Sequence, residues 1–366
     1  MKNRSVVILA GGKSKRFESH SLSSSDKAIR KLGEKTLLEN IVKTAGRTAD
    51  EVLITVSDES RREKYDRILK KDKFSNVRVL VDEDSRCDGP LRGIMTGLKH
   101  GGGKLIMTLP CDVPLIKPEV LDYLFQSLDR SDAAVPTWPN GSLEPLIGAF
   151  RKEVMARVAE AICWLGRQRP DDLFRSAPSV NFVSVEKDLK PLDPDLDSFV
   201  NINYPQDLAE FPRPTSESNL FSETLRFESG INLKNLTDVF NSAKISKGVE
   251  DAKIVESLYE RSVERGALFW SAAALERKAK ILEKSPEEEV RMKKKIKSEA
   301  SAVFRRAGEQ FEREAGMHVR RSILFLATHA LLDGEYCWRR AGAEQNAIQA
   351  RIKAEALYDE MGLERR

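Results

Sequence analysis

Three basic residues follow a glycine pair close to the start of the chain. Residues 9–17 read LAGGKSKRF and come directly after the apolar run VVI at residues 6–8. Two adjacent glycines at the end of a buried strand let the backbone turn without a Cβ, so several N–H groups can face one anion. Lys13, Lys15 and Arg16 supply countercharge. The pattern predicts a site for a phosphate chain, with a tight turn as the alternative, and its spacing is not that of a Walker loop.

Two further charged residues can act on the same ligand. Lys27, in the triplet DKA, returns soon after the glycine loop and can reach the same phosphates as a point charge. Asp82 follows the apolar run at residues 77–81, and its carboxylate can accept two hydrogen bonds from a guanine edge or one from a ribose hydroxyl. The string GPLRGI, beginning at Gly89, predicts a turn and a helix whose N-terminus faces the same crevice. A surface lysine, and a helix cap with a tight turn, are the alternative interpretations.

Asp112 is the candidate metal ligand. It lies in PCDVP at residues 110–114, after the apolar run at residues 105–109. A carboxylate between two prolines at a strand end is held rigidly, which suits Mg²⁺, an ion that takes one or two protein carboxylates together with phosphate oxygens and water. A purely structural aspartate is the alternative. Cys111 has no histidine beside it and is expected to be packed rather than reactive.

Two asparagines with alternate spacing stand in NINYPQDL at residues 201–208. The amides of Asn201 and Asn203 can hydrogen-bond a polar ligand or a metal-bound water, while the proline starts a closing helix. Helix capping alone would explain one asparagine. The pair therefore favours a binding site.

The elements that must position these residues alternate between strands and helices. Six short β-branched runs are separated by apolar residues at helical spacing, which predicts a doubly wound α/β domain with a mostly parallel sheet. The runs cover residues 6–9, 52–56, 77–81, 105–109, 133–136 and 180–185. Ligands of such sheets bind at the carboxyl ends of the strands, where several of these candidate residues fall.

The composition changes at PRPTS, residues 212–216. Two prolines and small polar residues predict a linker, so we expect a first domain over residues 1–212, a linker over 213–248 and an all-helical domain over 249–366, with no convincing strand after the linker begins. Helix breaks are expected at residues 285–286, at Gly316, at residues 333–334 and at Gly342. Alanines recur on the apolar faces, which predicts closely packed antiparallel helices in a short α-solenoid or a bundle. AGEQF and WRRAGA resemble phrases of tetratricopeptide-type repeats, although the period is irregular.

Composition excludes several classes of function. The net charge of +4 comes from 61 basic and 57 acidic residues that are interspersed, with no basic stripe, so nucleic-acid binding is not expected. The lysine run at residues 293–295 follows a glutamate run and is interpreted as a solvated face. Four cysteines without a C-x-x-C pair and four unclustered histidines argue against zinc and favour reduced thiols in a cytoplasmic protein. The apolar runs are too short to span a membrane.

Taken in order, the motifs LAGG-x-S-x-R, DKA, a strand-end Asp, GPL-x-G-I, PCD-x-P and N-x-N-x-P-x-D-L resemble the molybdenum cofactor guanylyltransferase family over residues 1–212. These are nucleotidyltransferases with a Rossmann-like fold of the nucleotide-diphospho-sugar transferase type. The resemblance implies Mg²⁺-dependent transfer of GMP from GTP to the terminal phosphate of molybdopterin, with release of pyrophosphate. Because that acceptor is already an ionised phosphate, the chemistry needs charge neutralisation and in-line positioning rather than a general base.

The resemblance also assigns site residues. The catalytic group would be Arg16, Lys27 and Asp112, with Asp112 as the Mg²⁺ ligand. Asp82 would meet the guanine or ribose, and Thr55 stands where the family often has an asparagine that contacts the nucleotide. The binding set would comprise Leu9, Ala10, Gly11, Gly12, Lys13, Lys27, Thr55, Asp82, Gly89, Asp112, Asn201 and Asn203. Residues 144–146, EPL, stand where the family has a segment that lines the acceptor side.

Two departures from the family leave alternatives open. Residues 18–25, ESHSLSSS, are longer than the family's usual link and are interpreted as a flap over the triphosphate that could shift Lys27 or change the preference between GTP and CTP. The helical region is not part of the core family, and it could bind a protein partner, deliver the acceptor or mediate self-association. Cobinamide phosphate, phospholactate or a sugar phosphate are alternative acceptors. A non-catalytic nucleotide-binding module with a helical scaffold is the alternative to an enzyme.

Overall fold

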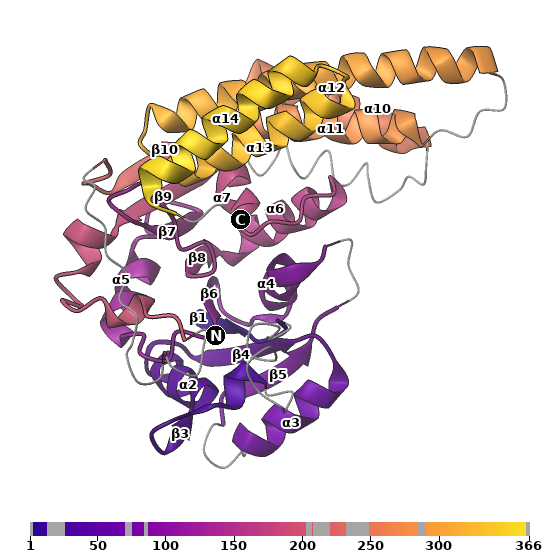
Figure 1. Ribbon diagram of the computed structural model, residues 1–366. Helices are drawn as coiled ribbons and strands as arrows, with labels where there is room; N and C mark the ends of the chain where they lie inside the picture. The colour runs from indigo at the N-terminus through magenta and orange to yellow at the C-terminus, as the bar shows by residue number, and fades with distance from the viewer. Residues whose placement is uncertain are drawn as a thin grey trace.

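The computed structural model describes residues 3–12, 26–69, 75–83, 87–202, 207, 220–231, 249–284 and 290–363, with side chains left out at 249–252 and 290–294. Within these ranges the chain forms an α/β part and a layer of long helices stacked beside it, as Figure 1 shows. The expected α/β fold with a second all-helical region is confirmed. The residues of the serine-rich segment 18–25, like Lys13, Arg16 and Asn203, lie outside the described ranges.

An eight-stranded mixed sheet forms the centre of the α/β part. Its strand order is β10-β9-β7-β8-β6-β1-β4-β5, with parallel pairing throughout the block β6-β1-β4-β5. The strands are β1 (Arg4–Leu9), β4 (Glu51–Val56), β5 (Val77–Val81), β6 (Leu105–Pro110), β7 (Ala133–Thr137), β8 (Gly148–Arg151), β9 (Ser179–Ser184) and β10 (Leu225–Glu228). A small separate hairpin pairs β2 (Lys31–Leu32) with β3 (Lys35–Thr36). All six predicted strands are present within a residue or two of the expected bounds.

Helices cover both faces of this sheet because neighbouring side chains of each strand point to opposite faces. Val6 and Ile8 of β1 pack with α2 (Leu37–Thr48), α3 (Glu59–Leu69) and α5 (Pro118–Gln126). Val7 and Leu9 pack instead with α4 (Gly89–His100), α6 (Lys152–Trp164) and the short α7 (Asp172–Ser176). The start of α2 is fixed by a capping box between Thr36 and Glu39. Both faces of the parallel block are therefore closed, and its carboxyl edge is left for a ligand.

One strand lies inside the segment predicted to be a linker. β10 pairs antiparallel with β9, with Phe227 opposite Val180, and so extends the sheet by an edge strand. The expectation of no strand after residue 212 is wrong at this point. Its four residues, LRFE, carry two charges and no β-branched residue, so they lack the usual composition of a strand.

The helical region consists of long helices that each pack against the next. They are α10 (Val249–Glu264), α11 (Leu268–Glu283), α12 (Val290–Val319), α13 (Leu324–Arg340) and α14 (Glu344–Met361), seen stacked in Figure 1. The predicted breaks near residue 285 and at Gly342 fall between helices, but α12 continues through Gly316 and α13 through Gly334. A glycine inside a helix costs only about 1 kcal/mol, which the tertiary packing of these long helices outweighs. Most of the expected alanines are buried where the helices meet.

The two parts share one hydrophobic core. The cluster that contains Val7 and Leu91 of the α/β part also contains Trp270 of α11 and Leu326 of α13. The indole N–H of Trp270 donates to the backbone oxygen of Ser176 at 2.9 Å, at the end of α7. The helical region therefore packs directly against the α/β part and shares its hydrophobic core.

Buried ion pairs cross the same boundary. Arg175, fully buried on α7, donates two parallel hydrogen bonds to the Glu314 carboxylate of α12, at 2.7 and 2.8 Å. Arg167 bonds Asp172 within the α/β part, Glu276 of α11 at 2.9 Å and Asp333 of α13. These carboxylates hold the pKa of Arg167 well above its usual value, against the effect of burial. Each buried charge is paired, as burial of a charge requires.

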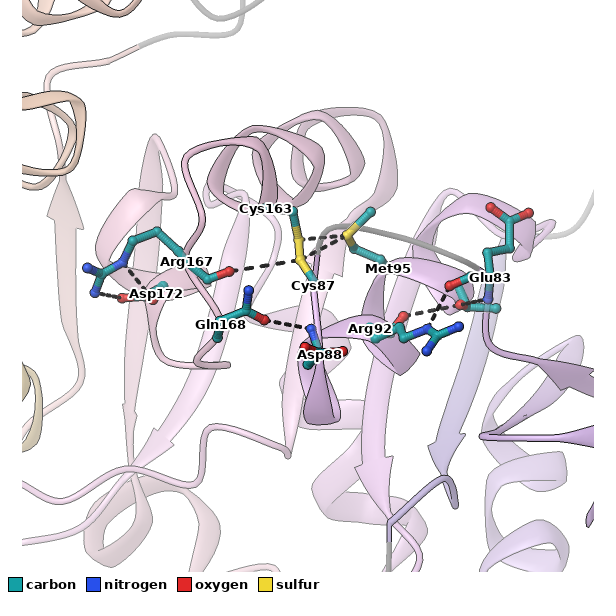
Figure 2. The surroundings of a disulfide bond; sticks show 10 residues. Glu83, Cys87, Asp88, Arg92, Met95, Cys163, Arg167, Gln168 and Asp172 are labelled. Atoms are coloured by element: carbon teal, nitrogen blue, oxygen red, sulfur yellow. Dashed lines mark hydrogen bonds and ion pairs between the residues drawn. A yellow bond between two sulfur atoms is a disulfide. The ribbon is translucent and has the colours of Figure 1, made fainter. Parts of the chain in front are cut away.

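A disulfide links the segment before α4 to α6. Cys87 and Cys163 form a disulfide bond, as Figure 2 shows, so the expectation of four reduced thiols is wrong for this pair. Their Cα atoms are 5.3 Å apart. The two cysteines are 76 residues apart and become neighbours only because α4 packs on α6. Cys111 and Cys337 are free. No helix within the described ranges has a stretch long and apolar enough to cross a membrane.

Candidate functional site

The carboxyl ends of four parallel strands place the candidate residues at one edge of the sheet. Leu9, the last residue of β1, pairs in register with Thr55 of β4 on one side and with Pro110 of β6 on the other. The glycine loop that follows Leu9 therefore starts between Thr55 and the segment that carries Asp112. Asp82 follows β5, and its N–H donates to the Val56 oxygen at the end of β4. The predicted convergence of these segments at one edge is present.

Lys27 and Asp112 form the polar centre of this edge. The Lys27 ammonium lies 2.8 Å from Asp112 Oδ2, and both side chains are largely shielded from solvent, at 13% and 22% exposure. Lys27 opens the short 3-10 helix η1 (Lys27–Ile29), which is capped by Asp26. Asp112 Oδ1 is buried and has no hydrogen-bond partner among the residues that the structure describes. Such an oxygen is suited to a cation, because an unpartnered buried carboxylate oxygen is otherwise costly.

The donor set near Asp112 fits Mg²⁺ better than a transition metal. Among the described residues, no group of three or more His, Cys, Asp or Glu side chains could hold a metal ion. Mg²⁺ does not need such a group, since it is commonly bound by one or two carboxylates with the rest of its octahedron filled by phosphate oxygens and water. The unpartnered Asp112 oxygen meets that requirement.

Asp82 and Thr55 form a second polar site on the other side of the glycine loop. Asp82 Oδ1 and Thr55 Oγ1 are both buried, and within the described ranges neither has a hydrogen-bond partner. A Cβ at Gly93 of α4 would lie 2.8 Å from Thr55 Oγ1 and 3.5 Å from Asp82 Oδ1, so only glycine lets this helix approach. Burial raises the pKa of Asp82 to about 6, although the Arg92 charge and the Thr96 hydroxyl oppose this rise. Two unpartnered acceptors side by side suit the N–H edge of a base or a hydroxyl.

Two residues of α3 that sequence analysis missed hold the segments of the phosphate side. Arg61 Nη1 donates to the backbone oxygens of Ala10 at 3.1 Å and Gly12 at 2.8 Å. The Tyr65 hydroxyl lies 2.9 and 2.8 Å from the two oxygens of Asp26. Burial, and then the Asp26 charge, raise the pKa of Tyr65, so its hydroxyl stays protonated and donates. The sequence of this helix, ESRREKYDRIL, is rich in charged residues and is typical of a helix exposed to solvent. The one signal in it is the spacing of Arg61 and Tyr65, which are four residues apart and therefore lie on the same side of the helix.

Glu144 lies on the acceptor side suggested by the resemblance. Its Oε1 accepts from the indole N–H of Trp138 at 2.9 Å. Burial and the Asp112 charge raise the pKa of Glu144 to about 7, although the Trp138 hydrogen bond opposes the rise. Burial likewise raises the pKa of Cys111 to about 12, which agrees with a packed thiol.

The helical region holds the turn that leads to Glu144. The Phe325 N–H of α13 donates to the Gly141 oxygen at 3.1 Å, and the Asn140 amide donates to the Met361 oxygen at the end of α14 at 2.7 Å. Gly141 has φ +79°, and a Cβ there would lie 2.5 Å from the Ser322 oxygen. The turn at residues 140–141 therefore contacts both the start of α13 and the end of α14.

Gly89 and Asn201, which were also predicted to bind the ligand, have fewer contacts with the site. Gly89 opens α4, and the residues of this helix that approach Asp82 begin one turn further on, with Arg92 and Gly93. The Asn201 side-chain amide donates to the Phe199 backbone oxygen at 3.4 Å, and the N–H of the next residue, Ile202, donates to the backbone oxygen of Asp112 at 2.9 Å. The segment that contains Asn201 therefore contacts Asp112 through a backbone hydrogen bond.

Comparison with known proteins finds relatives of the N-terminal part of the chain. Residues 6–180 match the family described as the MobA-like NTP transferase domain. A "Probable molybdenum cofactor guanylyltransferase" of Methanosarcina mazei is 33% identical over 206 residues, which cover 56% of this chain and 88% of the relative. A protein of the same description from Methanothermobacter thermautotrophicus is 34% identical, over 56% of this chain and 96% of the relative.

One solved structure is similar to part of this chain. The crystal structure of molybdopterin-guanine dinucleotide biosynthesis protein A from Archaeoglobus fulgidus is 26% identical, covers 56% of this chain and 95% of its own, and superposes with a TM-score of 0.45. The two curated relatives match 56% of this chain each, and residues 6–180 are those matched by the family model. On its sequence similarity, the chain is a nucleotidyltransferase and belongs to the MobA-like NTP transferase family.

Proposed function

We propose that the protein transfers GMP from GTP to the terminal phosphate of molybdopterin, with Mg²⁺ and with release of pyrophosphate. The single observation that carries the proposal is the Lys27–Asp112 pair, with an unpartnered Asp112 oxygen beside the end of β1. A cation and a metal-binding carboxylate at the exit of a glycine loop are what transfer of a nucleotidyl group requires. The description of the relatives as guanylyltransferases supports the choice of nucleotide and acceptor.

Each part of the site has a role in this proposal. The backbone of residues 9–12 would receive the phosphates, with Lys13 and Arg16 adding charge. Lys27 would neutralise charge on the phosphates, and Asp112 would hold Mg²⁺, which when bound stabilises negative charge on phosphate oxygens. Asp82 and Thr55, with their unpartnered oxygens, would accept hydrogen bonds from guanine or ribose. Gly89 would lie close to the part of the nucleotide that Asp82 and Thr55 bind.

The acceptor would approach from the side of Glu144 and the asparagine segment. Asn201 and Asn203 would bind its polar groups, since the chain next to Asn201 bonds the Asp112 backbone. The helical region, which holds the turn before Glu144, would be the place for a protein partner or for self-association. Because the acceptor brings its own ionised phosphate, no residue is assigned as a general base.

Pyrophosphate release tests the proposal directly. The full chain would be incubated with Mg²⁺, with each NTP in turn, and with molybdopterin, cobinamide phosphate, phospholactate or a sugar phosphate. Pyrophosphate that depends on both GTP and molybdopterin is the expected result. Release with a different nucleotide or acceptor would contradict that assignment, and binding of GTP without release under any condition would favour a non-catalytic module.

A further inference from the structure

Helix α3 contacts both segments that handle phosphate in the proposed function. Arg61 and Tyr65 are four residues apart and therefore lie on the same side of the helix. Arg61 bonds the glycine loop, and Tyr65 bonds Asp26, which directly precedes Lys27. These two segments flank the stretch 13–25, so both ends of that stretch are held by one rigid element.

The contact of Arg61 fixes the orientation of the loop peptides. Its Nη1 donates both of its N–H bonds to the loop, one to the Ala10 oxygen and one to the Gly12 oxygen. In a planar trans peptide the oxygen and the following N–H point in opposite directions. With the Ala10 oxygen turned toward Arg61, the Gly11 N–H points away from α3. Arg61 therefore holds the loop in an orientation that presents an amide donor to an anion and keeps the carbonyls away from it.

The contact of Tyr65 fixes the start of η1. Tyr65 is fully buried, so its hydroxyl has one position from which it reaches both oxygens of Asp26. Asp26 in turn accepts the Ala28 N–H at 3.3 Å and caps the turn that presents Lys27 to Asp112. Lys64 also pairs with Asp26, but at 3.7 Å and from an exposed position, so Tyr65 is the stronger restraint.

We propose that Arg61 and Tyr65 are positioning residues that align the glycine loop and Lys27 on one helix, so that the length of the stretch between them does not displace Lys27. The inference rests on the proposed function, because it names what holds the phosphate side of that site. In this proposal α3 sets the positions of both the glycine loop and the DKA motif, which lie on either side of the inserted residues 18–25 in the sequence.

The experiment compares Arg61→Ala and Tyr65→Phe with Arg62→Ala in the full chain. Arg62 is the matched control, since it neighbours Arg61 but pairs with Glu59 on the surface. Affinity for Mg²⁺-GTP is measured by equilibrium titration without acceptor, and affinity for guanosine, which lacks phosphates, is measured in parallel. Arg61→Ala is expected to weaken GTP binding about tenfold or more while guanosine binding stays unchanged. Arg61→Lys or added guanidinium is expected to restore part of the loss.

A double-mutant cycle tests Tyr65. Tyr65→Phe is expected to lower kcat about tenfold in the wild-type background and to have little further effect once Lys27→Ala is present, because both changes act through the same ammonium group. Equal losses of GTP and guanosine affinity in Arg61→Ala, or additive losses in the cycle, would mean general structural damage and would overturn the inference. Wild-type behaviour of Arg61→Ala and Tyr65→Phe would overturn the inference alone. Failure of the wild-type chain to bind GTP would overturn the proposed function and the inference with it.

Discussion

The Lys27 ammonium lies 2.8 Å from a carboxylate that comes 85 residues later in the chain, that of Asp112. The pair holds η1 against the end of β6, so it joins two segments of the proposed phosphate site and leaves the second Asp112 oxygen available. A substitution of either residue is therefore expected to act on catalysis more than on folding.

Asp112→Ala is expected to abolish turnover while the thermal unfolding midpoint changes little, because it removes the oxygen proposed to bind Mg²⁺ from a site at the edge of the fold. Pyrophosphate release and thermal unfolding, measured on the same preparation, check this. Lys27→Ala should still bind GTP in a metal-dependent manner, but its rate of pyrophosphate release should fall. Measurable turnover by Asp112→Ala would rule out its role as metal ligand.

GTP affinity is expected to fall as the pH is lowered through about 6. Burial favours the neutral acid and raises the pKa of Asp82 to about 6, whereas the ionised form accepts hydrogen bonds from guanine best. Since the folded state binds this proton more readily than the unfolded state, Asp82 alone makes stability decline as the pH rises from about 4 to 6. The measurement is a GTP titration at several pH values in wild type and Asp82→Asn. The difference between the two cancels the titration of the nucleotide, and an identical pH dependence in both would contradict the assignment.

Gly141→Ala is expected to destabilise the protein by about 1–3 kcal/mol and to raise the KM for the acceptor more than that for GTP. The new Cβ would lie 2.5 Å from the Ser322 oxygen, and the backbone has a positive φ. Gly166→Ala is the control, because Gly166 has φ +84° with nothing within 4 Å of its added Cβ, and so isolates the backbone strain. Equal effects of the two changes would show that contact with the helices does not support the turn.

Arg175→Met is expected to cost about 3–5 kcal/mol, because it leaves the fully buried Glu314 carboxylate without its bidentate partner. Arg226→Met removes an exposed pair with Glu228 and should cost less than 1 kcal/mol. Denaturant unfolding monitored in each part of the molecule measures both. A loss confined to the helical signal, with the α/β part unaffected, would mean that the two parts unfold independently.

Reduction of the Cys87–Cys163 bond is expected to lower the free energy of unfolding by up to about 4 kcal/mol, since the bond closes a loop of more than seventy residues. Alkylation of the unreduced, unfolded chain should modify Cys111 and Cys337 alone, which mass spectrometry detects. The bond also lies next to Asp88, whose N–H donates to the Gln168 side chain at 2.6 Å, as Figure 2 shows. Modification of four thiols would show that the bond does not form in solution.

The motifs at the strand ends could be predicted because each follows a β-branched run and lies in a short local pattern. Strand β8, with the sequence GAFR, could not, because its four residues carry no alternation or β-branching. Arg61 was missed because its partners are backbone oxygens, which leave no trace in composition. The partners of Arg175 and of Cys87 lie 139 and 76 residues away, and only the packing of helices on the sheet brings them together. Local chemistry was thus accessible from sequence, whereas contacts across the two parts were not.

The shared core has a consequence for how the two halves are inherited. All five residues of α7 are buried, and the Ser176 backbone oxygen and the Arg175 side chain are bonded to the helices that follow. A descendant that lost the helical half would leave the buried Arg175 without Glu314 and Asp333, and Arg167 without Glu276, so deletion would first require uncharged residues at these positions. Because Arg175 and Glu314 neutralise each other across the boundary, the residue at either position constrains which residues the other half can accept.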